Sequence, residues 1–179
     1  MSIQVFILSK LMIGKTYPYE LKKQMSEPIP LDELGGITES KLYYHFDSLA
    51  KHGLIEPVEI IKEEHRPDKQ VFAITDKGRE ELPNKIYKLF KSANDINDMV
   101  IALANIKYVD SEKVVTLLKE KLTSHKAHWE HIMKFENTSQ KDKKSENLHE
   151  LLIGYFTTKS DHSNYWLEEA IRQIEQDNL

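Results

Sequence analysis

The spacing of apolar residues predicts that the chain begins with two short helices and a connector. Residues 2–13 carry apolar side chains at the three- and four-residue spacing of a buried helix face. Residues 18–26 predict a second helix, because Pro18 suits a first helical turn. Residues 28–36 contain prolines and glycines, which are typical of a connector.

A third helix and a β-hairpin are predicted next. Thr38 is a favourable N-terminal cap and Gly53 a favourable C-terminal stop, so a helix is expected between them. Residues 58–62 and 70–74 are rich in Val, Ile and Phe and flank a turn-forming His-Arg-Pro-Asp sequence, as in two paired strands. The Thr-Asp pair that follows is expected to cap a fourth helix.

This order of elements predicts a mainly α-helical fold with a small β-hairpin. Residues 1–83 are expected to form a winged helix-turn-helix domain that binds DNA. In such a domain the third helix enters the major groove, and the hairpin, or wing, lies on the flanking backbone. Residues 84–179 are expected to form a helical domain for dimerisation and effector binding.

The third predicted helix has a core face and an outward face. At 100° per residue, Leu42, Phe46 and Leu49 share the core face. Tyr44 and His45 point outward, either as ordinary surface residues or as DNA contacts, and the predicted fold favours contacts. The side chains expected to contact DNA from this helix are Ser40, Lys41, Tyr43, Tyr44, His45 and Lys51.

Three segments of the sequence resemble the PadR family of bacterial transcriptional regulators. They are YPYELKK (17–23), ESKLYYHFDSLAKHGLIE (39–56) and HRPDKQVFAITDKGREEL (65–82). The resemblance implies that Tyr19 and Tyr43 lie near the DNA backbone and that Lys69 is the basic residue of the wing. Two positions depart from the family pattern: Pro18 replaces the usual Gly, and Asp68 replaces a small or basic residue.

The charge of the chain is unusual for a protein that binds DNA. The net charge is −4, and acidic residues slightly outnumber basic ones in residues 1–85. This balance predicts weak non-specific binding and high sensitivity to salt. The candidates for phosphate contact, each of which is otherwise a solvated surface charge, are Lys22, Lys23, Lys41, Lys51, Arg66 and Lys69.

The C-terminal half predicts long helices with an apolar seam. One helix is expected from residue 110 or 111 to about 136 and another from about 146 to 176, with a polar loop over residues 136–147. The helices could pair with each other or with a second chain, and a palindromic operator needs two chains. The residues expected to form the dimer interface are Val115, Leu118, Leu122, Trp129, Ile132, Leu152 and Trp166.

Aromatic residues in this half suggest a pocket for a small aromatic effector, as in PadR-like sensors of phenolic acids. The pocket candidates, which could equally be core residues of the dimer, are Trp129, Tyr155, Phe156 and Trp166. His125, His128 and His131 are three residues apart, but the outer two differ by about 120° around a helix. No metal site and no cofactor are therefore expected.

Several function classes are excluded by the sequence. The chain has no cysteine, so disulfides and zinc–thiolate sites are excluded. The apolar N-terminus is short and interrupted by Lys10, which favours neither a signal peptide nor a membrane span, and a cytoplasmic protein is expected. No catalytic motif is found, so an enzyme is not expected.

The favoured function is a homodimeric, sequence-specific DNA-binding repressor, and the alternative is a winged-helix module that binds protein instead of DNA.

Overall fold

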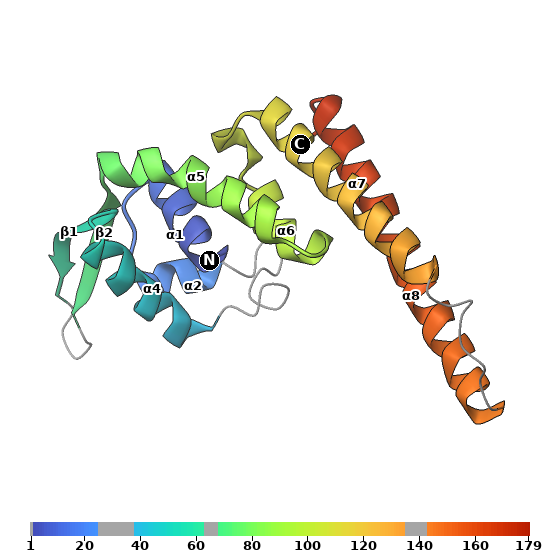
Figure 1. Ribbon diagram of the computed structural model, residues 1–179. Helices are drawn as coiled ribbons and strands as arrows, with labels where there is room; N and C mark the ends of the chain where they lie inside the picture. Colours follow the sequence, from blue (N-terminus) through green and yellow to red (C-terminus); the bar gives the residue numbers. More distant parts are fainter. Residues whose placement is uncertain (1, 25–37, 63–67, 135–142) are drawn as a thin grey trace. The chain divides into compact units, whose positions relative to one another are not determined.

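The computed structural model of the chain describes residues 2–24, 38–62, 68–134 and 143–179 (Figure 1). It is mainly helical with one antiparallel hairpin, as predicted. The elements are α1 (Ser2–Ile13), α2 (Pro18–Gln24), α4 (Glu39–Lys51), β1 (Ile55–Ile61), β2 (Lys69–Ile74), α5 (Asp76–Ser92), α6 (Ile96–Leu103), the 3₁₀ turn η1 (Ile106–Tyr108), α7 (Ser111–Lys134) and α8 (Lys143–Glu175).

The chain divides into two compact units, residues 1–110 and residues 111–179. The boundary predicted between residues 83 and 84 falls inside α5. The first unit extends farther because α6 packs on α1 and α5, and η1 packs on α5. The division of roles between a DNA-binding and a dimerisation domain stays a prediction.

Helix α1 is the centre of the first unit. Its side chains from Val5 to Ser9 are all buried, and so is that of Leu11. A helix that is apolar all round needs neighbours on every side. Helices α4, α5 and α6 and strand β2 supply these neighbours.

The ends of α4 are where the sequence predicts them. Thr38 caps the first turn, and its hydroxyl accepts a hydrogen bond from the backbone N–H of Lys41. At the other end Gly53 has φ +68°, the left-handed conformation that glycine adopts without strain. The backbone N–H of Leu54 donates to the carbonyl of Leu49, and both side chains are buried. This pattern closes the helix in a Schellman motif.

The hairpin starts three residues earlier than predicted. Strand β1 begins at Ile55, and Pro57 is paired with Phe72 in spite of its missing N–H. Proline is tolerated here because β1 is an edge strand and its register shifts between Pro57 and Glu59. The other edge of β2 is covered, because Thr16 and Phe72 exchange backbone hydrogen bonds.

The start of α5 is held against the end of α4. The hydroxyl of Thr75 donates to the carbonyl of Gly53, and the Thr75 N–H donates to the carbonyl of Leu54. A Cβ atom at Gly78 would lie 2.0 Å from the carbonyl oxygen of Leu54. Only glycine fits at this close approach of two backbones.

The second unit is an antiparallel pair of helices, α7 and α8. Its core includes Val114 and Leu118 from α7 and Leu167, Ile171 and Ile174 from α8. Ion pairs between Lys119 and Glu175 and between Lys126 and Glu168, at 2.7 Å each, join the same two helices. Helix α8 begins at residue 143, so the loop predicted over residues 136–147 is too long, and its part from 136 to 142 lies outside the described residues.

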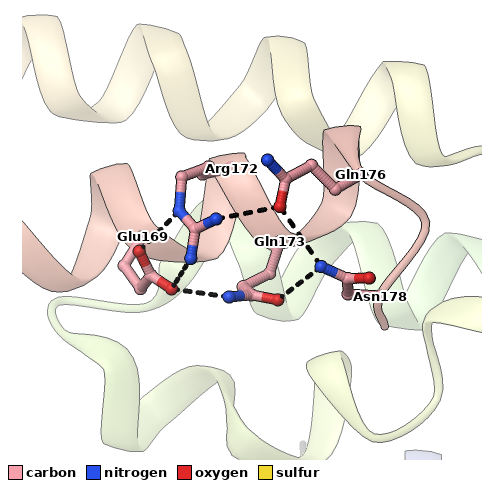
Figure 2. Close-up of polar contacts among 5 residues, drawn as sticks. All are labelled: Glu169, Arg172, Gln173, Gln176 and Asn178. Carbon is pink, nitrogen blue, oxygen red and sulfur yellow. Dashed lines mark hydrogen bonds and ion pairs between the residues drawn. The ribbon is translucent and has the colours of Figure 1, made fainter.

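A network of side chains surrounds the C-terminal end of α8 (Figure 2). Arg172 and Gln173 both donate to the carboxylate of Glu169, and these hydrogen bonds, that from Arg172 above all, lower the pKa of Glu169 to about 2. Asn178 donates from Nδ2 to the side-chain oxygens of Gln173 and Gln176. The network thus joins the last turn of the helix to the residues that follow it.

No helix in the described ranges has both the length and the apolar composition that a bilayer span requires.

Candidate nucleic-acid interface

The two faces of α4 are as the sequence predicts. Leu42, Phe46 and Leu49 are buried, whereas 69% of Tyr44 is exposed. The other candidate contact residues of the helix that are largely exposed are Ser40, Lys41, Tyr43 and Lys51. The helix therefore presents hydroxyl, amine and aromatic groups to solvent over its whole length.

His45 is less exposed than the sequence predicts. Its side chain is half-buried, and its ring meets the ring of Tyr44 edge to face with centroids 5.2 Å apart. Its Nδ1 has no hydrogen-bond partner among the described residues. Burial, and then nearby positive charges that include Lys41, lower the pKa of His45 from its ordinary value near 6.5. The imidazole is therefore neutral at pH 7.

Helix α2 and the wing supply further candidate contacts. Tyr19 is 43% exposed, Lys22 is exposed, and the ammonium of Lys69 lies 5.4 Å from the ring centroid of Tyr17. Arg66 lies outside the described residues. The structure brings Tyr19, Tyr43 and Lys69 to the wall of one hollow of about 550 Å³ between α2, α4 and β2.

Two acidic residues line the same hollow, and sequence reasoning missed their shared location. Asp47 comes from α4, and Asp68 precedes β2. Asp68 was expected at the wing, whereas no role was predicted for Asp47. Asp47 lies four residues after Tyr43 on α4, and this spacing was the signal that could have placed it beside Tyr43. At the outer strand of the wing, Glu59 is paired with Lys15 at 2.6 Å, which reduces its effect on a nearby phosphate.

The predicted effector residues of the second unit do not converge on one site. The ring centroids of Trp129 and Phe156 are 5.5 Å apart, and Tyr155 adjoins Phe156. Trp166 instead contacts His162 and Tyr165. It lies ten positions from Phe156 on the same helix, about 15 Å along the axis. A separate hollow of about 360 Å³ is lined in part by Trp129.

His125 of α7 is engaged by neighbouring side chains. His125 accepts a hydrogen bond from the indole of Trp129, and its Nδ1 is 2.9 Å from the side-chain oxygen of Asn164. Within the described ranges, no three His, Asp or Glu side chains are grouped so that they could hold a metal ion.

Residues 7–84 match the transcriptional regulator PadR-like family. Among solved structures, the chain is 32% identical to a transcriptional regulator from Clostridium thermocellum, with 48% of this chain and 79% of that chain covered and a TM-score of 0.41. Bacillus subtilis PadR in complex with operator DNA is 18% identical, with 97% and 99% covered and a TM-score of 0.42. The same regulator in complex with p-coumaric acid is 17% identical, with 98% and 99% covered and a TM-score of 0.41. No curated protein matches the chain.

The fold and the family match together place the chain among DNA-binding transcriptional regulators with a winged helix-turn-helix, which are not enzymes. The chain belongs to the PadR-like family of these regulators, through the segment from residue 7 to residue 84.

Proposed function

We propose that the protein is a homodimeric repressor that reads a palindromic operator. The observation that carries the proposal is the exposed face of α4, flanked by Tyr19 from α2 and Lys69 from the wing. Helix α4 enters the major groove, where Lys41, Tyr44 and the half-buried His45 reach base edges. The residues that contact the sugar–phosphate backbone are Tyr19, Lys22, Ser40, Tyr43, Lys51, Arg66 and Lys69.

The surface of α8 supports a dimer. A set of exposed apolar residues on this helix, the α8 apolar face, consists of Leu148, Leu151, Leu152, Tyr155, Tyr165 and Trp166. The first four recur at spacings of three and four residues, so they lie on one side of the helix. A contiguous apolar surface of this kind is covered by a partner in most proteins. Because the core residues Leu167, Ile171 and Ile174 already face α7, a second copy covers the α8 apolar face.

The predicted dimer residues divide between two roles under this proposal. Leu118 is buried within the chain, and half-buried Val115, Leu122, Trp129 and Ile132 complete the pairing of α7 with α8. Leu152 and Trp166 are exposed and face the second copy. Two copies related by a two-fold axis can place their α4 helices about one DNA turn, roughly 34 Å, apart.

The experiment combines mass and DNA binding. Sedimentation of the full chain at micromolar concentration is expected to give about twice the chain mass of 20.9 kDa. With operator DNA added, the complex is expected to contain two chains per operator. Leu151→Glu places a charge on the α8 apolar face at a position that is 69% exposed, so the single chain should still fold. It is expected to sediment as a monomer and to lose operator affinity.

The matched control is Glu150→Lys, a charge change at an exposed neighbour that lies off the α8 apolar face. It should remain dimeric. A wild-type monomer, or a dimer that tolerates Leu151→Glu, would refute the proposed interface. Transcription in vitro from a promoter that contains the operator tests the sign of regulation, since a repressor lowers the transcript yield.

An aromatic effector is the last part of the proposal. The ring pair of Trp129 and Phe156 and the adjoining hollow of about 360 Å³ support a site for a small planar molecule. The hollow is also lined by Ser160 and Asn164, whose polar side chains suit a phenolic hydroxyl. Binding there would release DNA only if the ligand prefers a dimer arrangement that cannot span both half-sites.

A further inference from the structure

The hollow between α2, α4 and β2 has walls and a floor of aromatic rings. Its floor includes Phe46 and Phe72, which are buried and have ring centroids 5.2 Å apart. Tyr17, Tyr19 and Tyr43 line its sides. At about 550 Å³ it is in the size range of small-molecule sites, about 300–1,000 Å³.

The aromatic faces at this site already accommodate a positive charge. The Lys69 ammonium lies 5.4 Å from the ring centroid of Tyr17, and the Lys23 ammonium lies 5.1 Å from that of Tyr19. Both distances are within the range of cation–π attraction. The ring faces are negative because of their quadrupoles, so they favour cations over anions.

The charged groups that line the hollow favour the same kind of ligand. Asp47 and Asp68 are exposed carboxylates, and Lys69 is the one basic group among the described lining residues. These three lining groups sum to one negative charge, and the Lys23 ammonium at the Tyr19 ring is not among the lining groups. A phosphate that enters the hollow meets two carboxylates, whereas an amine is attracted by both.

We propose that this hollow binds a small aromatic cation, namely a planar ring system that carries a protonated or quaternary nitrogen. The ring packs among the tyrosines over Phe46 and Phe72, and the nitrogen lies toward Asp47 and Asp68. The bound cation excludes DNA, because Tyr19, Tyr43 and Lys69 line the hollow and are also backbone contacts. This exclusion rests on the proposed function, whereas binding of the cation itself does not.

The test of binding uses the full chain without DNA and the probe (naphthylmethyl)trimethylammonium in isothermal titration calorimetry. The controls are the neutral isostere in which carbon replaces the nitrogen, and naphthylacetate as an anion. The cation is expected to bind about tenfold or more tightly than the neutral isostere, with naphthylacetate weakest. Equal affinity for cation and neutral isostere, or no binding of the cation at millimolar concentration, would overturn the proposal.

Substitutions locate the site. Asp47→Asn and Asp68→Asn are each expected to weaken the cation about fivefold, since both carboxylates are exposed and partly screened. Tyr17→Leu removes an aromatic face and should weaken it similarly, while Tyr17→Phe keeps the face and the affinity. Glu80→Gln, at an exposed position of α5 outside the lining, is the control and should change nothing. If Asp47→Asn, Asp68→Asn and Tyr17→Leu all bind the cation as tightly as the wild type does, the ligand binds elsewhere and the assignment of the site is overturned.

A second arm tests competition with operator DNA. Above its dissociation constant, the probe should lower the apparent affinity of the wild type for the operator further with each increase in its concentration, as competition requires. Tyr17→Leu should need about five times more probe for the same loss of operator affinity, which separates the site from direct effects of the probe on DNA. Unchanged operator affinity at saturation would overturn the exclusion. Probe binding by a protein that binds no operator would instead refute the proposed function and leave the hollow as a cation site.

Discussion

Tyr44 and Lys69 are expected to make different kinds of contact with DNA. Under the proposed function, the exposed side chain of Tyr44 on α4 meets base edges, whereas Lys69 of the wing meets the backbone. Tyr44→Ala should weaken operator binding by about 1–3 kcal/mol and binding to random DNA much less. Lys69→Ala should weaken both alike and reduce the salt dependence by about one unit of slope per site.

Binding isotherms on operator and random duplexes over a range of salt concentrations separate the two variants. Tyr44→Phe is the control for the hydroxyl alone. If Lys69→Ala altered specificity while Tyr44→Ala had no effect, α4 would not be the recognition helix.

The buried environment of His45 should make stability depend on pH. Because burial lowers the folded-state pKa of His45, the unfolded chain takes up the proton more readily as the pH falls below about 6.5. Stability is therefore lost as the pH falls from that value toward the folded-state pKa. His45→Gln lacks this titration and should lose less stability between pH 7 and pH 5. Denaturant unfolding at both pH values measures this difference, and equal losses in the two proteins would contradict it.

At the scale of elements, Gly78 joins α5 to the end of α4. Gly78→Ala would drive a Cβ into the carbonyl oxygen of Leu54, at 2.0 Å, and the two helices would have to separate. We expect a loss of about 2 kcal/mol or more in the free energy of unfolding. Operator binding should also weaken, because the end of α4 moves. Gly14→Ala is the matched control, since among the described residues nothing lies within 4 Å of its added Cβ. Thermal unfolding should give a lower melting temperature for Gly78→Ala than for Gly14→Ala. Similar melting temperatures would show that the approach of residue 78 to the Leu54 carbonyl oxygen is not tight.

The end of α8 contains a left-handed residue that is not glycine. Asp177 has φ +54°, and the backbone N–H of Asn178 donates to the carbonyl of Gln173, as in a Schellman motif. The hydrogen bond between the Asn178 and Gln173 side chains occupies the position where such motifs often place an apolar contact (Figure 2). Asp177→Gly should relieve strain and stabilise the protein by about 0.5–1 kcal/mol. Chemical denaturation is the measurement, and a destabilised glycine variant would mean that the Asp177 side chain stabilises the turn.

At the scale of the whole molecule, the effector and the operator should oppose each other. A hundredfold loss of DNA affinity requires about 2.7 kcal/mol of coupling, and linkage requires that operator DNA weaken effector binding by the same factor. Trp166→Phe leaves Trp129 as the only tryptophan, so its fluorescence reports on the proposed site. Titration of aromatic acids should quench it, less readily when operator is present. An effector affinity that is the same with and without operator DNA would rule out this coupling.

Much of the candidate DNA-binding surface could be predicted because its signals are local. The period of 3.6 residues separates Leu42 and Phe46 from Tyr44, and this separation is confirmed. Thr38 and Gly53 mark the ends of α4 through hydrogen bonds within a few residues. The exposure of His45 was overestimated, because helical phase gives direction but not the packing of neighbouring elements.

Local signals in the chain were enough to predict the order of helices and strands, the stop at Gly53 and the outward side of α4, because caps and periodicity act over a few residues. Only the packing of distant segments brings Asp47 and Asp68 into one aromatic hollow with Tyr17 and requires that residue 78 lack a Cβ. It also decided which side of α8 remains uncovered after α7 has packed against it. These features depend on contacts between segments far apart in the chain, and a residue's spacing along one element does not specify the neighbour that another element brings to it.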